Sequence, residues 1–232
     1  MTGDGSGRRP RVAFQGEAGA FSEQAALASQ GGAARPVPCP TLEELFALTG
    51  AGGADFAVAP IENTLYGSVH RTYDLLAASP LHVVGEQIVH VRHHLIGCRG
   101  ATLAGVRTVE SHPVALGQCE SFFAAHAVLR PREADDTAAS VRRVCRAGDP
   151  ERAAIGSERA ARLYNGRVLA RDIQDHPRNF TRFLVLARQR ATFGERDKLA
   201  VTVQLAHRPG TLLRALEPFA ARGIDLTRIE SR

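Results

Sequence analysis

The sequence predicts an α/β fold that is built as two lobes over residues 11–188. Short apolar or β-branched runs alternate there with segments of helical periodicity, a pattern typical of a mainly parallel sheet covered by helices. A long, mostly extended run at Leu81–Leu95 interrupts the alternation and predicts a crossover between two such lobes, with a cleft between them. Residues 189–198 are polar and predict a linker, and residues 199–232 predict a smaller α+β piece.

Local signals place the elements along the two lobes. The predicted strands are 11–15, 36–39, 55–60, 106–110, 153–155, 166–169 and 183–187. The predicted helices are 21–29, 41–48, 69–77, 111–126, 136–146 and 157–164. Thr41-Leu42-Glu43-Glu44 matches a capping box, and Pro113 stands at the first position of its helix. Asp136 and Ser157 are residue types that cap helices.

The two ends of the chain differ from the lobes. Residues 1–10 lack any apolar run, which predicts a disordered tail and no signal peptide. At the other end we expect a strand at 199–205, a turn at 207–210, a helix at 211–222 and a strand at 224–229. A β-α-β piece of this size cannot cover its own apolar face, so it indicates a module cut off midway or completed by another chain.

Composition excludes several classes of protein. Hydrophobic residues at 44% and charged residues at 23% are ordinary globular values. The four cysteines form no C-x-x-C pair, which favours reduced thiols in a cytoplasmic protein over disulfides or zinc. The net charge of +5 comes from scattered arginines that rarely alternate with aromatics, so it favours an anionic small molecule over nucleic acid. No segment is long enough to predict a membrane span.

Hydroxyl residues stand at the predicted strand-to-helix junctions. Free N–H groups and the positive end of the helix dipole make each such junction a candidate anion site, although Ser and Thr are also ordinary helix caps. Polar neighbours favour a functional role at two of them: Glu62 and Asn63 lie close to one, and His112 and Gln118 to another. The junction hydroxyls are Ser22, Ser68, Ser111, Thr137 and Ser157.

The loop after the predicted strand 55–60 is unusually polar. Asn63 could orient a carboxylate or hydroxyl, and Glu62 could act as a general acid if burial raised its pKa. The alternative is an Asn that holds the turn and a Glu in an ion pair. The histidines of the H-x-x-H-H cluster at 90–94 include two that face opposite sides of an extended segment, and no acidic or cysteine set completes a shell, so we expect no metal.

The segment Asn179–Phe183 brings an amide, a hydroxyl and a guanidinium to the entrance of an apolar strand. A guanidinium is a strong anchor for a carboxylate, and a Thr hydroxyl can donate to a hydroxyl or an alkoxide. Arg182 could equally pair with an acid and hold the two lobes together. Phe183 heads the apolar strand, which favours a place in the core over contact with a ligand. No G-x-S-x-G elbow, Walker loop or G-x-G-x-x-G occurs, so no nucleotide or acyl-enzyme chemistry is predicted.

These motifs together resemble a bacterial, monofunctional prephenate dehydratase with a partial C-terminal ACT domain. The resemblance follows the whole chain in order, and no fused chorismate mutase is expected before Arg11. The matching segments are Val12–Gly16, Gly19–Glu23, Pro60–Thr64, Gly67–Val69, Ser111–Pro113, Ala115–Cys119, Asn179 with Thr181–Phe183, Arg208–Gly210 and Ile229–Arg232.

The resemblance implies a catalytic region like the type II periplasmic binding proteins and the conversion of prephenate to phenylpyruvate without a cofactor. It implies that Thr181 is the catalytic donor to the departing hydroxyl, with Glu62 or His112 as alternative proton sources. A homodimer or homotetramer, with L-phenylalanine as feedback effector, is also implied. The implied substrate-binding residues are Ser22, Glu62, Asn63, Ser68, Ser111, His112, Gln118, Thr137, Asn179, Arg182 and Phe183. The implied effector-binding residues are Pro209, Gly210, Thr211, Leu212, Glu230, Ser231 and Arg232.

Two other functions remain open from the sequence. One is arogenate dehydration, in which an amino group replaces the side-chain keto oxygen of the substrate. The other is a cytoplasmic solute-binding or sensor protein that uses the same cleft without turnover. The polar set at Asn179–Phe183 favours an enzyme over a binding protein.

Overall fold

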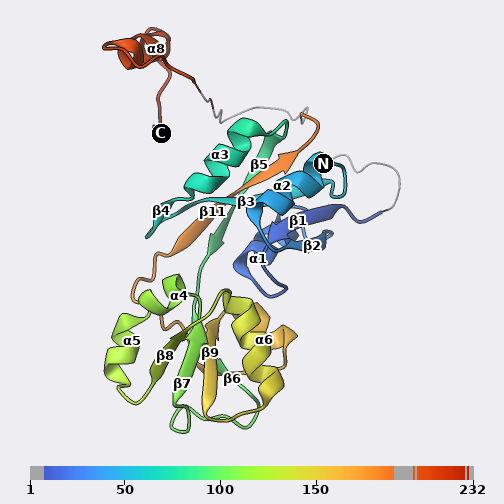
Figure 1. Ribbon diagram of the computed structural model, residues 1–232, viewed down its shortest axis with the longest axis vertical. Helices are drawn as coiled ribbons and strands as arrows, with labels where there is room; N and C mark the ends of the chain where they lie inside the picture. The colour runs from blue at the N-terminus through green and yellow to red at the C-terminus, as the bar shows by residue number, and fades with distance from the viewer. Residues whose placement is uncertain (1–7, 191–200, 202, 228, 230–232) are drawn as a thin grey trace. The chain divides into compact units, whose positions relative to one another are not determined.

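A computed structural model describes residues 8–190, 201, 203–227 and 229 of the chain. The chain divides into two compact units, Met1–Ala191 and Thr192–Arg232. The first unit contains two sheets, each with its own helices (Figure 1). This arrangement confirms the prediction of two α/β lobes.

The first lobe is a six-stranded sheet with strand order β2-β1-β3-β11-β5, and β4 pairs with β3. β1 is parallel to β2 and β3, whereas β11 runs antiparallel to β3 and β5, so the sheet is mixed and the expectation of a mainly parallel sheet was wrong. The strands are β1 (Arg11–Gln15), β2 (Arg35–Cys39), β3 (Phe56–Asn63), β4 (Gly67–Ser68), β5 (His82–His90) and β11 (Phe180–Ala187). The helices are α1 (Phe21–Ala28), α2 (Leu42–Gly50) and α3 (His70–Ala78).

The second lobe is a five-stranded sheet with strand order β10-β6-β9-β7-β8. β7, β8 and β9 are parallel, and β6 is antiparallel to β9 and β10. The strands are β6 (His94–Gly97), β7 (Thr108–Ser111), β8 (Arg130–Glu133), β9 (Arg152–Gly156) and β10 (Arg167–Ala170). The helices are α4 (Pro113–Gly117), α5 (Glu120–Ala125), α6 (Thr137–Ala147) and α7 (Glu158–Leu163).

Two elements of the second lobe differ from the prediction. The helix expected over 111–126 is divided into α4 and α5, because the carboxylate of Asp175 accepts from the backbone N–H groups of Glu120 and Ser121 and starts a new helix there. β8 was not expected, since all four of its residues are exposed and one is Pro131. A strand of this kind fits only at the edge of a sheet, where β8 lies.

Alternation along β11 gives the first lobe two separate cores. Phe183 and Val185 pack in the cluster that includes Phe14 and the helix α1, whereas Leu184 and Leu186 pack on the other face with Leu45 of α2. Successive side chains of a strand point to opposite faces, so both faces of β11 are covered. The same alternation determines the direction of the polar residues that precede Phe183.

The chain passes between the lobes twice, once from β5 to β6 and once from β10 to β11 (Figure 1). The two crossing segments are hydrogen-bonded to each other. The Val91 N–H donates to Asn179 O at 2.8 Å, and the Ile173 N–H donates to His93 O at 2.9 Å. These bonds fix the backbone on which His93 and Asn179 are placed.

The loop between β1 and α1 reaches from the first lobe to the second. Ser157 Oγ donates to Gly19 O at 2.6 Å, and Tyr164 donates to Ala18 O at 2.8 Å. Glu17 accepts from Arg142 through two bonds of 2.7 Å. The contact between the lobes therefore includes buried hydrogen bonds to the backbone as well as a half-buried ion pair.

Helix caps follow the predicted residues. Thr41 accepts from the Glu44 N–H, Asp136 from the Ala139 N–H and Ser157 from the Ala160 N–H. At the N-terminus, Arg8 pairs with Asp55 and Pro10 O accepts from the Arg35 N–H. Residues 8–10 are therefore held on the first lobe and do not belong to the expected tail.

The second unit contains α8 (Thr211–Ala220), which agrees with the expected helix. The strands expected at 199–205 and 224–229 are not formed in residues 201, 203–205, 224–227 and 229. Many apolar side chains of this unit, among them Val203, Leu213 and Ile224, are exposed. A strand needs a pairing partner and a covered face, and this unit supplies neither among its described residues.

In the part of the chain that the structure describes, no helix has the length and apolarity needed to cross a membrane.

Gly19 offers a test of the contact between the lobes. Its φ is +94°, and a Cβ there would lie 2.9 Å from both Cα and Cβ of Ala160. Gly19→Ala is therefore expected to lower the free energy of unfolding by about 2–4 kcal/mol, through backbone strain and overpacking. Urea denaturation measures this loss.

Gly100→Ala is the matched control, since nothing lies within 4 Å of the added carbon and its φ is not positive. Its free energy of unfolding should change by about 1 kcal/mol or less. Equal stabilities of the two variants would contradict the close contact at Gly19.

Candidate active site

The predicted Asn63 and Thr181 meet where β3 ends and β11 begins. They are direct partners in the antiparallel pairing of these strands, so their side chains share one face of the sheet. Asn63 Nδ2 lies 3.0 Å from Thr181 Oγ1 and 2.9 Å from Asn179 Oδ1, and it also reaches Phe180 O at 3.2 Å. Thr181 is half-buried, so its hydroxyl is not enclosed in the core.

A chain of hydrogen bonds continues from Asn179 into the second lobe. Asn179 Nδ2 donates to Gln118 Oε1 at 2.9 Å, and His93 Nε2 lies 2.7 Å from the same oxygen. Asn179, Gln118 and His93 are all buried, at 0%, 7% and 3% exposed. We call this set, consisting of His93, Gln118, Asn179, Asn63 and Thr181, the amide chain.

The backbone fixes the direction of the bonds around Asn63. Asn63 Oδ1 accepts from the N–H groups of Leu65 at 2.9 Å and Tyr66 at 3.1 Å. Backbone N–H groups can only donate, so the amide of Asn63 cannot be reversed and its NH₂ group faces Asn179 and Thr181. Thr181 Oγ1 therefore accepts a hydrogen bond from Asn63, and its own hydrogen can be donated to a ligand.

Arg182 and Glu62 lie on the other face of the same strands. They are register partners, as Asn63 and Thr181 are, and alternation turns them away from Thr181. Arg182 donates to Glu86 of β5 through Nε at 2.8 Å, so it pairs with an acid within the first lobe. Their role as substrate ligands, like that of Ser68 opposite Glu62, remains a prediction.

The junction hydroxyls are used in different ways. Ser157 caps α7, but Ser22 Oγ donates to Gln15 O, and the buried Ser111 Oγ donates to Ile155 O of the neighbouring strand at 2.9 Å. Thr137 is the first residue of α6, whose cap is Asp136. Only Ser157 among these four acts as the helix cap expected from the sequence.

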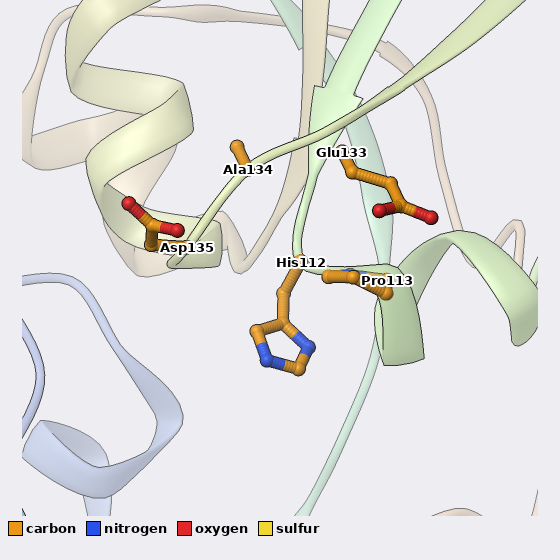
Figure 2. A pocket seen from close by; sticks show the side chains of 5 residues that line it. All are labelled: His112, Pro113, Glu133, Ala134 and Asp135. Atoms are coloured by element: carbon orange, nitrogen blue, oxygen red, sulfur yellow. The ribbon is translucent and has the colours of Figure 1, made fainter.

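A pocket of about 330 Å³ lies at the N-terminal end of α4 (Figure 2). His112 and Pro113 line it from the cap and first residue of α4, and Glu133, Ala134 and Asp135 line it from the end of β8 and the segment that follows. His112 Nδ1 accepts from the Val114 N–H and so begins α4, while Gln118 of the amide chain follows the same helix at its other end. Thr181 does not line this pocket.

Another pocket, of about 500 Å³, includes Phe21, His90 and Arg159 in its lining and is not lined by Thr181 either.

Phe183, which is 3% exposed, packs in the core of the first lobe, as expected from its place at the head of an apolar strand.

The histidine segment 90–94 contributes one residue, His93, that the sequence does not connect to the site. The sequence offers His93 only as one of a cluster of histidines, and no group of three or more His, Cys, Asp or Glu suited to a metal occurs among the described residues. Its partner is instead the amide of Gln118, 25 positions away.

Burial keeps the His93 ring neutral. It lowers the pKa of His93 from 6.5 to about 4, because the charged form is penalised away from water; the bond to Gln118 opposes this shift and the neighbouring His94 adds to it. The amide chain therefore contains no charged group at neutral pH.

The first unit is a two-lobed α/β structure whose lobes are joined by two crossings. A line of neutral hydrogen-bonding groups ends there on a half-buried hydroxyl and is a candidate site for a small polar ligand. Residues 12–191 match the family model described as "PDT: Prephenate dehydratase". Arogenate dehydratase/prephenate dehydratase 2, chloroplastic, from Arabidopsis thaliana is 42% identical over 229 residues, which cover 98% of this chain and 60% of that protein. The chain belongs to the prephenate dehydratase family.

Solved structures agree with this membership. A prephenate dehydratase from Arthrobacter aurescens in complex with L-Phe matches with a TM-score of 0.83 and 31% identity, over 96% of this chain and 76% of that one. GqqA, described as a novel type of quorum quenching acylase, matches with a TM-score of 0.83 and 32% identity, over 96% and 81% of the two chains. The chain spans about 60% of the length of the Arabidopsis relative.

The neutral His93 ring makes stability depend on pH. The unfolded chain takes up a proton on this ring near pH 6.5 and the folded chain near pH 4, so its contribution to stability is complete above pH 6.5 and is lost as the pH falls toward 4. Between about pH 7 and about pH 5 the loss should be about 2 kcal/mol. Urea denaturation at both pH values measures it.

The control is His93→Gln, which has no titrating ring at this position. Its stability should fall less over the same range, since all other groups are shared. Equal losses in the two proteins would contradict a buried neutral ring.

Proposed function

We propose that this protein converts prephenate to phenylpyruvate, carbon dioxide and water. The bond between the ring and its carboxylate breaks, the electron pair enters the ring, and the ring hydroxyl leaves with one proton as water. Aromatisation supplies the driving force, and neither electrons nor an acyl group are transferred to the protein. The enzyme has to assist the departing oxygen and bring the ring carboxylate into a drier environment.

The direction of the Thr181 hydroxyl is the observation that carries this proposal. Because Asn63 Nδ2 donates to Thr181 Oγ1, the Thr181 hydrogen is left to donate to an oxygen of the ligand. A Thr hydroxyl is too weak an acid to release its proton fully. It instead stabilises the negative charge that develops on the departing oxygen, an effect of about 3–4 kcal/mol for one well-placed donor.

The full proton needs a second source. Alternation turns Glu62 to the face opposite Thr181. We infer that His112, at the start of α4, supplies the proton and that neutral donors bind the carboxylates of the substrate. Arg182, already paired with Glu86, would reach a carboxylate only by exchanging partners.

Arogenate is the alternative substrate, since the Arabidopsis relative is named for both activities. The test is to supply prephenate and arogenate separately and to follow phenylpyruvate by its absorbance in alkali and phenylalanine by chromatography. Turnover of neither, with binding of both, would support the solute-binding alternative and overturn the proposal. An acylase assay is the control reaction, because GqqA is described as an acylase.

We also propose that L-phenylalanine is a feedback effector that binds an ACT-like module at 199–232 in a homodimer or homotetramer. The Arthrobacter aurescens protein was solved with L-Phe, which supports this ligand. Pro209, Gly210, Thr211 and Leu212 form the turn and the start of α8, where Gly210 has a φ of +82°. Glu230, Ser231 and Arg232 lie outside the described residues. The free cysteines favour a cytoplasmic location.

Substitutions of Thr181 test the assigned donor. Thr181→Val keeps the shape of the side chain and removes the hydroxyl, and Asn63 still has Asn179 Oδ1 and Phe180 O as acceptors. We expect kcat to fall by about 10²–10³-fold with little change in melting temperature. The measurement is steady-state turnover of prephenate.

Thr181→Ser keeps the hydroxyl and is the matched control, with kcat closer to the wild type than that of Thr181→Val. Near-normal turnover by the Val variant would refute the assignment of Thr181.

A further inference from the structure

His93 reaches Thr181 through the whole amide chain, although it lies in the crossing between β5 and β6. Four hydrogen bonds connect them in sequence: His93 to Gln118, Gln118 to Asn179, Asn179 to Asn63, and Asn63 to Thr181. Every bond is 2.7–3.0 Å long. A change at one end can therefore be transmitted to the other through well-formed contacts.

The direction of each bond can be followed back to His93. Because the amide of Asn63 is fixed by backbone donors, Asn179 must present its oxygen to Asn63 and its NH₂ group to Gln118. Gln118 consequently presents its oxygen to both Asn179 and His93. An oxygen can only accept, so His93 Nε2 carries the ring hydrogen.

The other ring nitrogen agrees with this tautomer. His93 Nδ1 is buried and has no hydrogen-bond partner among the described residues. A hydrogen on Nδ1 would be a buried donor without an acceptor, which costs free energy. It would also leave a lone pair on Nε2 facing the lone pairs of the Gln118 oxygen, and the two would repel each other. The neutral Nε2–H form leaves only an acceptor unsatisfied.

His93 itself is held from three sides. Its ring lies edge-on to Phe21 of α1, with centroids 5.6 Å apart and an interplanar angle of 77°. Its backbone N–H donates to Gln174 Oε1 at 2.8 Å, and its carbonyl accepts from the Ile173 N–H. The donor at Nε2 is thus fixed in place by α1 and by both crossing segments.

We propose that His93 is a positioning residue for the reaction, whose Nε2–H holds the Gln118 oxygen toward Asn179 and so keeps the Thr181 hydroxyl hydrogen directed at the substrate. This inference rests on the proposed function. Without the donor at position 93, the buried Gln118 oxygen loses one of its two hydrogen bonds, and the Gln118 amide is held there by the Asn179 NH₂ group alone. Gln118 and Asn179 are then less firmly fixed, which loosens the bond between Asn179 and Asn63 and, through it, the described donor to Thr181 Oγ1.

Two substitutions separate this role from simple packing. His93→Phe keeps the ring beside Phe21 and removes the donor, and we expect kcat to fall by about 10–100-fold with KM within about twofold. His93→Gln places an amide N–H close to the position of Nε2 and should restore kcat to within about fivefold of the wild type. Failure of His93→Gln to exceed His93→Phe in kcat would overturn the proposal.

His94→Phe is the matched control. His94 is the next residue, is 4% exposed, and its Nδ1 accepts from the Asp172 N–H at 3.1 Å, outside the amide chain. It should lose stability as His93→Phe does, but keep the kcat of the wild type. An equal fall of kcat in both variants would assign the effect to packing and overturn the proposal.

The coupling to Thr181 gives a second readout. If His93 acts through Thr181, His93→Phe should not lower the residual kcat of Thr181→Val any further. Multiplicative losses in the double variant would overturn the proposal, because they require an independent effect of His93.

The tautomer can be measured on the unsubstituted protein and does not depend on turnover. The ¹⁵N shifts of a histidine-labelled sample should show a protonated Nε2 and a bare Nδ1 for His93 at neutral pH. A protonated Nδ1 would overturn the positioning role even if prephenate is the substrate. Absence of turnover in the wild type with the Nε2–H tautomer present would instead overturn the proposed function and, with it, the role of His93 in that reaction.

Discussion

The constraint on which the site depends is the pair of backbone N–H groups that hold the oxygen of Asn63. Leu65 and Tyr66 belong to the short turn between β3 and β4, and they fix one amide in one orientation. Because each later member of the amide chain has to match its neighbour as donor or acceptor, that single orientation determines all the others. A main-chain turn thereby decides which atom of Thr181 is free to act on a ligand.

The amide chain also links the site to the architecture of the first unit. Asn63 and Thr181 belong to the first lobe, Gln118 belongs to the second, and His93 and Asn179 lie on the two crossing segments. A movement of one lobe against the other would change the bonds of Gln118 to Asn179 and His93. The groups that hydrogen-bond in sequence to the Thr181 hydroxyl therefore also connect the two lobes.

Neutral groups suit the chemistry proposed for this site. A buried carboxylate in the amide chain would repel a dianionic substrate, and a buried cation would stabilise the substrate as much as the transition state. Amides and a neutral imidazole place partial charges where they are needed and carry a smaller cost of burial than ions. Several arginines of the lobes are paired with acids, as Arg142 is with Glu17 and Arg182 with Glu86.

The sequence by itself determined the alternation of strands and helices, the caps at Thr41 and Asp136 and the crossover near residue 90, and it selected Asn63, Gln118, Asn179 and Thr181 as candidate site residues. These follow from local periodicity, capping preference and motif order, which act over a few residues. Only the tertiary structure decided that the sheets are mixed, that Arg182 and Glu62 turn away from Thr181, and that His93 joins Gln118. Those outcomes depend on strand pairing and on hydrogen bonds between residues 25 to 118 positions apart, and no local pattern encodes them.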